Sequence, residues 1–198
     1  MKKIPRVFKM DPNNKALCLP EPTPGCEWVL AGEGIATRKY DGTSCLIRTA
    51  LGSIHPQLYK RYDAKNGKTP PEDWTPCEEA PDEVTGHWPG WLLVSETAPE
   101  DWMHRAVFEG TMSMPITAYE DGTYELCGPK LGKNPEKLER YVLIRHGQNI
   151  HEVFRDYDGI RGYLAITEIE GLVFHHPDGR MAKIRRKDFG FQWPQEIK

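Results

Sequence analysis

The sequence predicts an α+β fold built mainly from antiparallel β-sheets with short flanking helices. The 198 residues include 18 glycines and 17 prolines, both above average usage, and this composition favours many turns over long helices. Short stretches with strand-like patterns are separated by turn signals such as Asp-Gly along most of the chain. Nothing repeats at the period of a solenoid or a propeller, so we expect a single domain over residues 1–198.

The first part of the chain is expected to be an extended arm over residues 1–30. Its prolines exclude long regular elements, and they are Pro5, Pro12, Pro20, Pro22 and Pro24. Strands are then expected at residues 26–31, 35–39 and 44–49, with an Asp41-Gly42 turn before the last of them.

The remaining elements are short as well. Residues 69–90 are acidic and proline-rich without helical or strand periodicity, which predicts a long loop. Helices are expected at residues 99–107, where proline and acidic residues favour a first turn, and at residues 150–157. Further strands are expected at residues 58–62, 124–128, 141–146, 171–175 and 182–186, with a turn at residues 176–179.

Charge and cysteine content restrict the classes of protein. The net charge of −3 excludes a general basic field of the kind that binds nucleic acid indiscriminately, so any such site must be local. The cysteines are odd in number, widely spaced and never arranged as CxxC, which argues against a disulfide framework or a zinc ribbon; they are Cys18, Cys26, Cys45, Cys77 and Cys127. No apolar run is long enough to span a bilayer, and we expect a soluble, cytoplasmic protein.

Lys39 is the first candidate for chemistry. It lies in TRKYDGT, at the end of an expected strand and just before a tight turn. A lysine in a pocket can act as a nucleophile if burial or nearby cations lower its pKa, and Lys183, Arg185 and a bound metal would do so. The alternative is a solvated lysine beside an Asp-Gly hairpin, and the short motif alone does not decide between them.

The segment EGLVFHHPDGRMAKIRR predicts two strands joined by a turn. With a loop of two or four residues, Glu170, together with Leu172 and Phe174, would share a face with Lys183 and Arg185, whereas an odd loop would break this relation. A carboxylate beside two cations could bind a phosphate bridged by a divalent metal. The alternative is a ladder of salt bridges on a solvated face.

Glu125 lies in TYELCGPKLG, within an otherwise apolar expected strand. A carboxylate in that setting suits a ribose hydroxyl or a metal-bound water. The alternative is a charge on an edge strand.

The order of these motifs resembles a known superfamily. KYDGT, YELCGPK, EGLVF and AKIRRKDFGF follow one another as do the motifs of the covalent nucleotidyltransferases, which include ligases and capping enzymes. The blocks GEGIATRKYDGT, GHWPGW, YELCGPKLGKNPE and RKDFGFQWP are similar to a compact ATP-dependent RNA ligase family that joins 5′-phosphate to 3′-hydroxyl RNA ends. The resemblance covers residues 32–194 and implies an ATP-grasp-like adenylyltransferase domain.

The resemblance also implies roles for individual residues. Lys39 would take AMP from ATP and release pyrophosphate, with Thr37 contacting the adenine and Arg38 also at the nucleotide. Glu125 would meet the ribose or a metal ion. Glu170 would hold Mg²⁺ or Mn²⁺, and the AMP phosphate would be bound by Lys183 and Arg185.

Four further residues receive weaker assignments from the resemblance. Tyr141 would stack on the adenine, although a tyrosine that begins an apolar strand also suits the core. Lys60 and Arg61 would contact the RNA 5′-phosphate, or face solvent. His146 would contact the phosphate or act as a general base, or would be a hydrogen-bonded histidine at a strand end.

Two departures from the superfamily pattern refine the prediction. Ser44 stands where many DNA ligases have an arginine after KxDG, which points away from DNA ligase. The sequence stops soon after AKIRRKD, leaving no room for an OB-fold domain, so we expect a stand-alone catalytic domain or one that works with a protein partner. The alternatives are a nucleotidyltransferase that uses GTP or another acceptor, and a non-catalytic RNA-binding protein with a ligase fold.

Overall fold

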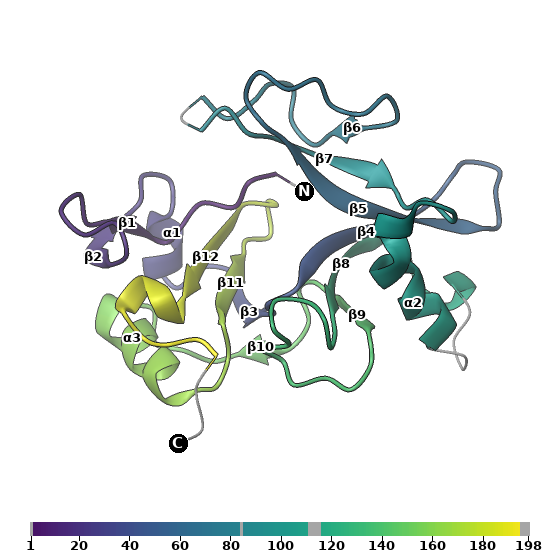
Figure 1. Cartoon of the computed structure of the whole chain (residues 1–198). Helices are drawn as coiled ribbons and strands as arrows, with labels where there is room; N and C mark the ends of the chain where they lie inside the picture. Colours follow the sequence, from purple (N-terminus) through teal and green to yellow (C-terminus); the bar gives the residue numbers. More distant parts are fainter. Residues whose placement is uncertain (1, 84, 111–115, 195–198) are drawn as a thin grey trace. The chain divides into compact units, whose positions relative to one another are not determined.

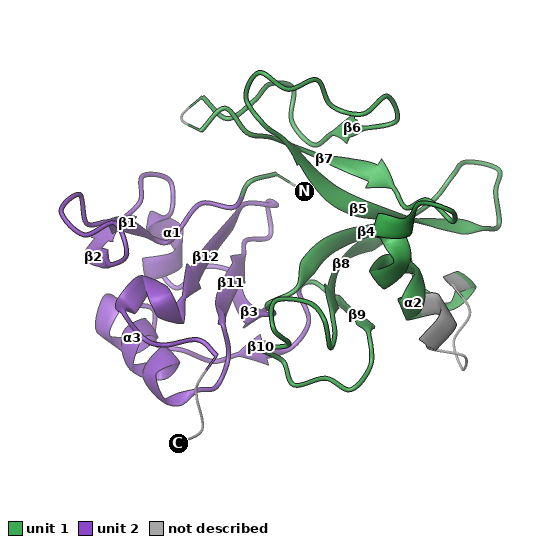
Figure 2. Ribbon diagram, viewed as in Figure 1, with its two compact units in different colours: residues 1–3, 41–146 green, residues 4–40, 147–198 purple. Residues whose placement is uncertain are grey.

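The computed structural model describes residues 2–83, 85–110 and 116–194, and Figure 1 labels its helices and strands. The chain forms two compact units, which Figure 2 colours separately. Unit 1 comprises Met1–Lys3 and Asp41–His146, and unit 2 comprises Ile4–Tyr40 and Gly147–Lys198. Each unit has a β-sheet of its own. The expectation of a single domain stays a prediction.

Unit 2 contains a four-stranded antiparallel sheet in the order β10-β3-β11-β12. Its strands are β3 (Ile35–Lys39), β10 (Ile150–His151), β11 (Gly171–His175) and β12 (Met181–Arg185). One face is the core face, because Leu172, Phe174, Ala182 and Ile184 are fully buried. Side chains alternate along a strand, so the residues between these four lie on the opposite face.

The helices of unit 2 also contribute to its core. They are α1 (Glu27–Leu30), α3 (Tyr157–Ile166) and the short 3₁₀ helix η3 (Arg186–Phe189). Ile160 and Leu164 of α3 are fully buried and belong to the same apolar cluster as the core face of the sheet.

The N-terminal segment of unit 2 is more buried than its prolines indicate. It forms the strand pair β1 (Phe8–Met10) and β2 (Cys18–Pro22), and the prolines keep both strands short. Val7 and Phe8 are nevertheless fully buried. The segment therefore contributes to the core, although an extended arm was expected.

Unit 1 contains a six-stranded antiparallel sheet in the order β6-β7-β5-β4-β8-β9. The strands are β4 (Thr43–Thr49), β5 (Pro56–Ala64), β6 (Thr75–Pro76), β7 (Trp88–Leu93), β8 (Gly122–Cys127) and β9 (Val142–Arg145). The helical elements are η1 (Pro99–Asp101), α2 (Trp102–Gly110) and η2 (Ile116–Ala118). Cys45, Ile47 and Leu126 of the sheet are fully buried in one cluster with Val107 of α2.

The predicted class of antiparallel sheets with short helices is confirmed. All five cysteines are free thiols. Within the described ranges, no helix is long and apolar enough to cross a membrane. The ATP-grasp-like assignment stays a prediction.

Two local predictions are wrong. The strand expected at residues 26–31 is instead the one-turn helix α1 (Glu27–Leu30), set between Gly25 and Gly32, whose φ angles of 84° and 83° are left-handed. Residues 150–157 begin as strand β10, and helix α3 starts only at Tyr157, because the Asp156 side chain caps it by accepting a hydrogen bond from the Gly159 amide. The expected loop over residues 69–90 is irregular for most of its length, apart from the two-residue strand β6 and the start of β7.

Candidate active site

The face of the unit 2 sheet that is turned away from the core carries several of the predicted site residues. Thr37, Val173 and Lys183 are paired neighbours on three adjacent strands, and Lys39, Gly171 and Arg185 form the next row. Paired residues share a face, so strands β3 and β12 contribute three cations to one surface: Lys39, Lys183 and Arg185.

The prediction that Leu172 and Phe174 share a sheet face with Lys183 depended on a loop of two or four residues, and the structure does not meet this condition. The connection between β11 and β12 contains five residues, 176–180, and an odd number reverses the relation between the two strands. Leu172 and Phe174 pair with Ile184 and Ala182 in the core and do not share the face of Lys183. The cations instead lie on the face of Val173.

Glu170 nevertheless meets the cations. It immediately precedes β11, and its Oε2 contacts Nζ of Lys39 in an ion pair. The glutamate side chain is 8% exposed and the lysine side chain 21% exposed. Nζ of Lys39 also donates a hydrogen bond to the Tyr40 carbonyl oxygen at 3.2 Å. Lys39 is therefore a largely buried, paired lysine, and the alternative of a solvated lysine does not describe it.

The cations lie close enough to influence one another. The pKa of Lys183 is lowered to about 8, first by burial and then by the positive charges of Lys39, Arg185 and Arg6, with Glu170 opposing them. The positive charges on this face repel one another. The electrostatic potential there is therefore positive, which favours an anionic ligand.

Arg185 is held by Asp188, a residue that the sequence analysis did not single out. Its Nη2 donates to Oδ1 of Asp188 at 2.7 Å and its Nε donates to Oδ2 at 3.1 Å, in a bidentate pair. Asp188 is 1% exposed and also accepts a hydrogen bond from the Arg185 amide at 2.9 Å. The local signal for this contact is the acidic residue three positions after the strand end, which forms a capping box at η3.

Thr37 lies on the same face as Lys39, but its hydroxyl is hydrogen-bonded within the sheet. It is 1% exposed, and its Oγ1 donates to the Val173 carbonyl oxygen at 3.2 Å and lies 3.0 Å from Nε2 of His175. His175 stands on the same face, because it pairs with Ile35 two residues before Thr37. No motif in the sequence pointed to this histidine.

Arg38 lies on the other side of its strand. It pairs with Leu172, whose side chain faces the core, and its guanidinium lies 4.5 Å from the centre of the Tyr40 ring. The structure does not bring Arg38 to the face of Lys39, because consecutive residues of a strand point to opposite faces.

In unit 1, Glu125 occupies an interior strand. Strand β8 lies between β4 and β9, so the alternative of a charge on an edge strand is wrong. Its Oε1 accepts a hydrogen bond from the Gly42 amide at 3.1 Å, and its Oε2 lies 2.9 Å from Nε2 of His146. Only glycine fits at position 42, because an added Cβ would lie 2.1 Å from the Leu126 carbonyl oxygen. Glu125 therefore fixes the Asp-Gly turn that follows Lys39 in the chain.

Lys60 and Arg61 point to opposite faces of β5. Lys60 pairs with the fully buried Cys45, and its ammonium contacts the carboxylate of Asp101, which is 1% exposed. Arg61 lies with its guanidinium 5.7 Å from the centre of the Trp91 ring. Lys60 is therefore the partner of a buried carboxylate, and contact of either residue with an RNA phosphate stays a prediction.

Tyr141 is packed within unit 1. A Cβ added to Gly128 would lie 2.2 Å from Cδ1 of its ring, and the Trp102 ring packs edge-on with the ring centres 5.9 Å apart. The tyrosine belongs to the periphery of the apolar cluster of unit 1. The core alternative describes it better than adenine stacking.

The two predicted metal ligands are the carboxylates of Glu170 and Glu125. Among the described residues, no group of three or more histidine, cysteine, aspartate or glutamate side chains could hold a metal ion. Mg²⁺ is commonly held by one or two carboxylates together with substrate phosphates and waters. Glu170 lies beside the cations that would bind such a phosphate, and its role as a metal ligand stays a prediction. Glu125 is in contact with the Gly42 amide and with His146.

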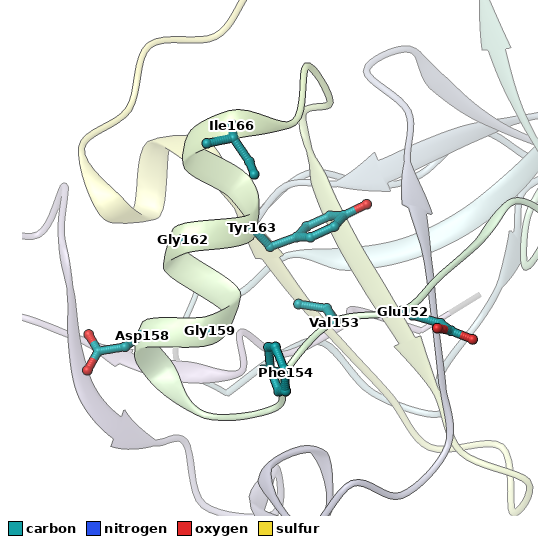
Figure 3. A pocket seen from close by; sticks show the side chains of 8 residues that line it. All are labelled: Glu152, Val153, Phe154, Asp158, Gly159, Gly162, Tyr163 and Ile166. Carbon is teal, nitrogen blue, oxygen red and sulfur yellow. The ribbon is translucent and has the colours of Figure 1, made fainter.

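A separate pocket of unit 2 lies at helix α3, and Figure 3 shows the side chains that line it. Phe154 and Ile166 are 82% and 85% exposed there, and Glu152 and Asp158 are its charged residues. None of the predicted site residues lines this pocket. Its acidic and apolar lining does not suit a phosphate.

Comparison with known proteins finds similarity to RNA ligases. RNA ligase 1 of Rattus norvegicus is 25% identical to this chain, across 81% of this chain and 68% of that protein. RNA ligase 1 of Danio rerio is 26% identical, with 80% and 68% covered, and that of Mus musculus is 25% identical, with 81% and 68% covered. No family model matches the sequence.

Proposed function

The chain is related to the RNA ligase 1 family, and from this relationship we propose that it is an ATP-dependent ligase that joins RNA ends through AMP bound to Lys39. The observation that carries the proposal is the cation-rich face of unit 2. There Lys39 is largely buried, in contact with Glu170, and on the same sheet surface as Lys183 and Arg185.

The first step would be transfer of AMP to the protein. Nζ of Lys39, once it has lost its proton, attacks the α-phosphorus of ATP; a nitrogen–phosphorus bond forms, the bond to the β-phosphate oxygen breaks, and pyrophosphate leaves. Lys183 and Arg185 would stabilise negative charge on the transferred phosphate. Glu170 would hold Mg²⁺ or Mn²⁺, which reduces the charge of the triphosphate when bound.

The next two steps would act on RNA. A 5′-phosphate oxygen attacks the phosphorus of lysyl-AMP, which releases Lys39 and gives an RNA with a 5′–5′ linked adenylate. The 3′-hydroxyl of a second end then attacks the 5′-phosphate phosphorus and expels AMP, leaving a phosphodiester. Both steps depend mainly on positioning and on charge stabilisation around the same phosphate.

Residues of unit 1 would have supporting roles in this proposal. Glu125 and His146 hold each other and the Gly42 amide, so they would fix the turn that follows the nucleophile. Their buried hydrogen bonds favour a positioning role over direct metal binding. An RNA with 5′-phosphate and 3′-hydroxyl ends is the proposed substrate.

The test is labelling with ATP or GTP that carries a radioactive α-phosphate, followed by denaturing electrophoresis. Variant Lys39→Ala removes the nucleophile, and Lys9→Ala is a matched control because Lys9 is an exposed lysine of unit 2 that pairs with Glu21. Label from ATP on the wild type and on Lys9→Ala, but not on Lys39→Ala, supports the proposal. Label from GTP alone points to guanylyl transfer, and no label after bound AMP has been removed with pyrophosphate refutes a nucleotidyltransferase.

The sealing reaction is tested separately with RNA. Wild-type protein is expected to join a 5′-phosphorylated end to a 3′-hydroxyl end and to leave a 5′-hydroxyl end unjoined. Lys39→Ala is expected to fail with ATP but to seal an RNA that already carries the 5′-adenylate. If Lys39→Ala retains both reactions, Lys39 is not part of the mechanism.

A further inference from the structure

The N-terminal segment pairs with strand β12 directly beside Lys183. Arg6 and Lys183 form a parallel β-bridge, flanked by hydrogen bonds from the Val7 amide to the Lys183 carbonyl oxygen and from the Lys183 amide to the Pro5 carbonyl oxygen, both 2.9 Å long. Bridged residues of neighbouring strands share a face. Arg6 therefore adds a cation to the face that carries Lys39 and Lys183.

The backbone of Arg6 is firmly anchored. The next residues, Val7 and Phe8, are fully buried in the core of unit 2. The guanidinium forms an ion pair without hydrogen-bond geometry, because its Nε lies 3.4 Å from Oδ1 of Asp188, the buried carboxylate that also binds Arg185. The Arg6 side chain remains 40% exposed, so it can contact a ligand without leaving Asp188.

The charges on this face do not balance. Among these described residues, Lys39, Lys183, Arg185 and Arg6 carry four positive charges, and Glu170 and Asp188 carry two negative ones, an excess of two positive charges within the group. Arg6 is one of the cations that disfavour the charged form of Lys183. An anion with two or more charges would relieve this repulsion, and a guanidinium binds phosphate oxygens in a bidentate manner.

We propose that Arg6 is a phosphate-binding residue of the site, which holds a substrate phosphate beside the one bound by Lys183. In the first step this would be the β- or γ-phosphate of ATP, and in the later steps it would be a phosphate of the RNA. The identity of the ligand rests on the proposed function, whereas the binding of a phosphate compound by Arg6 does not require that any ligation takes place.

Direct binding tests this role without catalysis. Calorimetric titration with α,β-methylene-ATP and Mg²⁺ compares the wild type with Arg6→Gln, Arg6→Lys and the control Lys9→Gln, which removes a nearby charge of the same segment. Loss of one charge-assisted contact is expected to weaken binding by about tenfold in Arg6→Gln. Arg6→Lys is expected to fall between the wild type and Arg6→Gln, and Lys9→Gln is expected to match the wild type.

A second experiment distinguishes the two sources of phosphate. Sealing of pre-adenylated RNA is measured for the same variants, with thermal unfolding to verify that each is folded. If Arg6→Gln binds the nucleotide more weakly but seals normally, Arg6 contacts the triphosphate. If it binds the nucleotide normally but seals poorly, Arg6 contacts a phosphate of the RNA. Unchanged nucleotide binding and unchanged sealing in folded Arg6→Gln would overturn the proposal. If the wild type binds the analogue but forms no lysyl-AMP, the proposed function fails and the binding result still decides the role of Arg6.

Discussion

Replacing Lys183 with methionine should stabilise the protein while removing its activity. Burial and neighbouring cations lower the pKa of Lys183 from 10.5 to about 8, so the charged lysine is disfavoured in the folded state. A shift of this size corresponds to roughly 3 kcal/mol at pH 7. Methionine has a similar length and no charge, and we expect Lys183→Met to raise the free energy of unfolding at pH 7 by up to about that amount.

The pH dependence of this effect has a defined sign. Between pH 8 and pH 10.5 the unfolded chain binds more protons at Lys183 than the folded chain does, so the stability of the wild type rises with pH across this window. The advantage of the variant should therefore be largest at pH 7 and should shrink toward pH 10.

Urea unfolding of the wild type and Lys183→Met at pH 7 and pH 9.5 measures the difference, and α-phosphate labelling measures activity. The labelling should be lost, because the methionine cannot bind a phosphate. A variant that is less stable than the wild type at pH 7, or whose advantage grows with pH, would refute the explanation from buried charge. A variant that is more stable but labels normally would show that Lys183 does not hold the phosphate.

Three further substitutions, at Lys60, His104 and Gly171, test local contacts within the two units. Lys60→Met leaves the buried carboxylate of Asp101 without its ammonium partner and should cost about 3 kcal/mol in urea unfolding; an unchanged midpoint would contradict this. Burial lowers the pKa of His104, so the wild type should lose stability as pH falls below 6.5, and His104→Leu should flatten that dependence between pH 7.5 and 5.5. Gly171→Ala would place a Cβ 2.1 Å from a backbone oxygen of β12 and should abolish labelling, whereas Gly162→Ala, with nothing within 4 Å of its Cβ, should label normally.

The strands that carry the site could be predicted because their signals are local. Short apolar segments on either side of a turn identify β11 and β12, and the Asp-Gly pair identifies the end of β3. The facing of β11 and β12 was wrong because the number of residues in a connection decides it, and the sequence does not show where each strand ends. The helix at residues 26–31 was also missed, because a single turn between two glycines has no periodicity.

The candidate site was only partly predictable for a related reason. Lys39, Glu170 and Lys183 lie in short motifs, and the structure brings them to one face. Arg6 lies far from Lys183 in the sequence and pairs with it only through a parallel bridge, which leaves no local signal. The true partner of Lys60, a buried carboxylate 41 residues away, was equally invisible.

The central claim is that Lys39 carries AMP, and mapping the modified residue tests it most directly. The protein would be incubated with ATP and Mg²⁺, digested at neutral pH and analysed by mass spectrometry, with Lys39→Ala treated in parallel. We predict one AMP adduct, on the peptide that contains Lys39, and none on the variant. An adduct on another residue such as Lys183, or RNA sealing with no adduct on any peptide, would contradict the account.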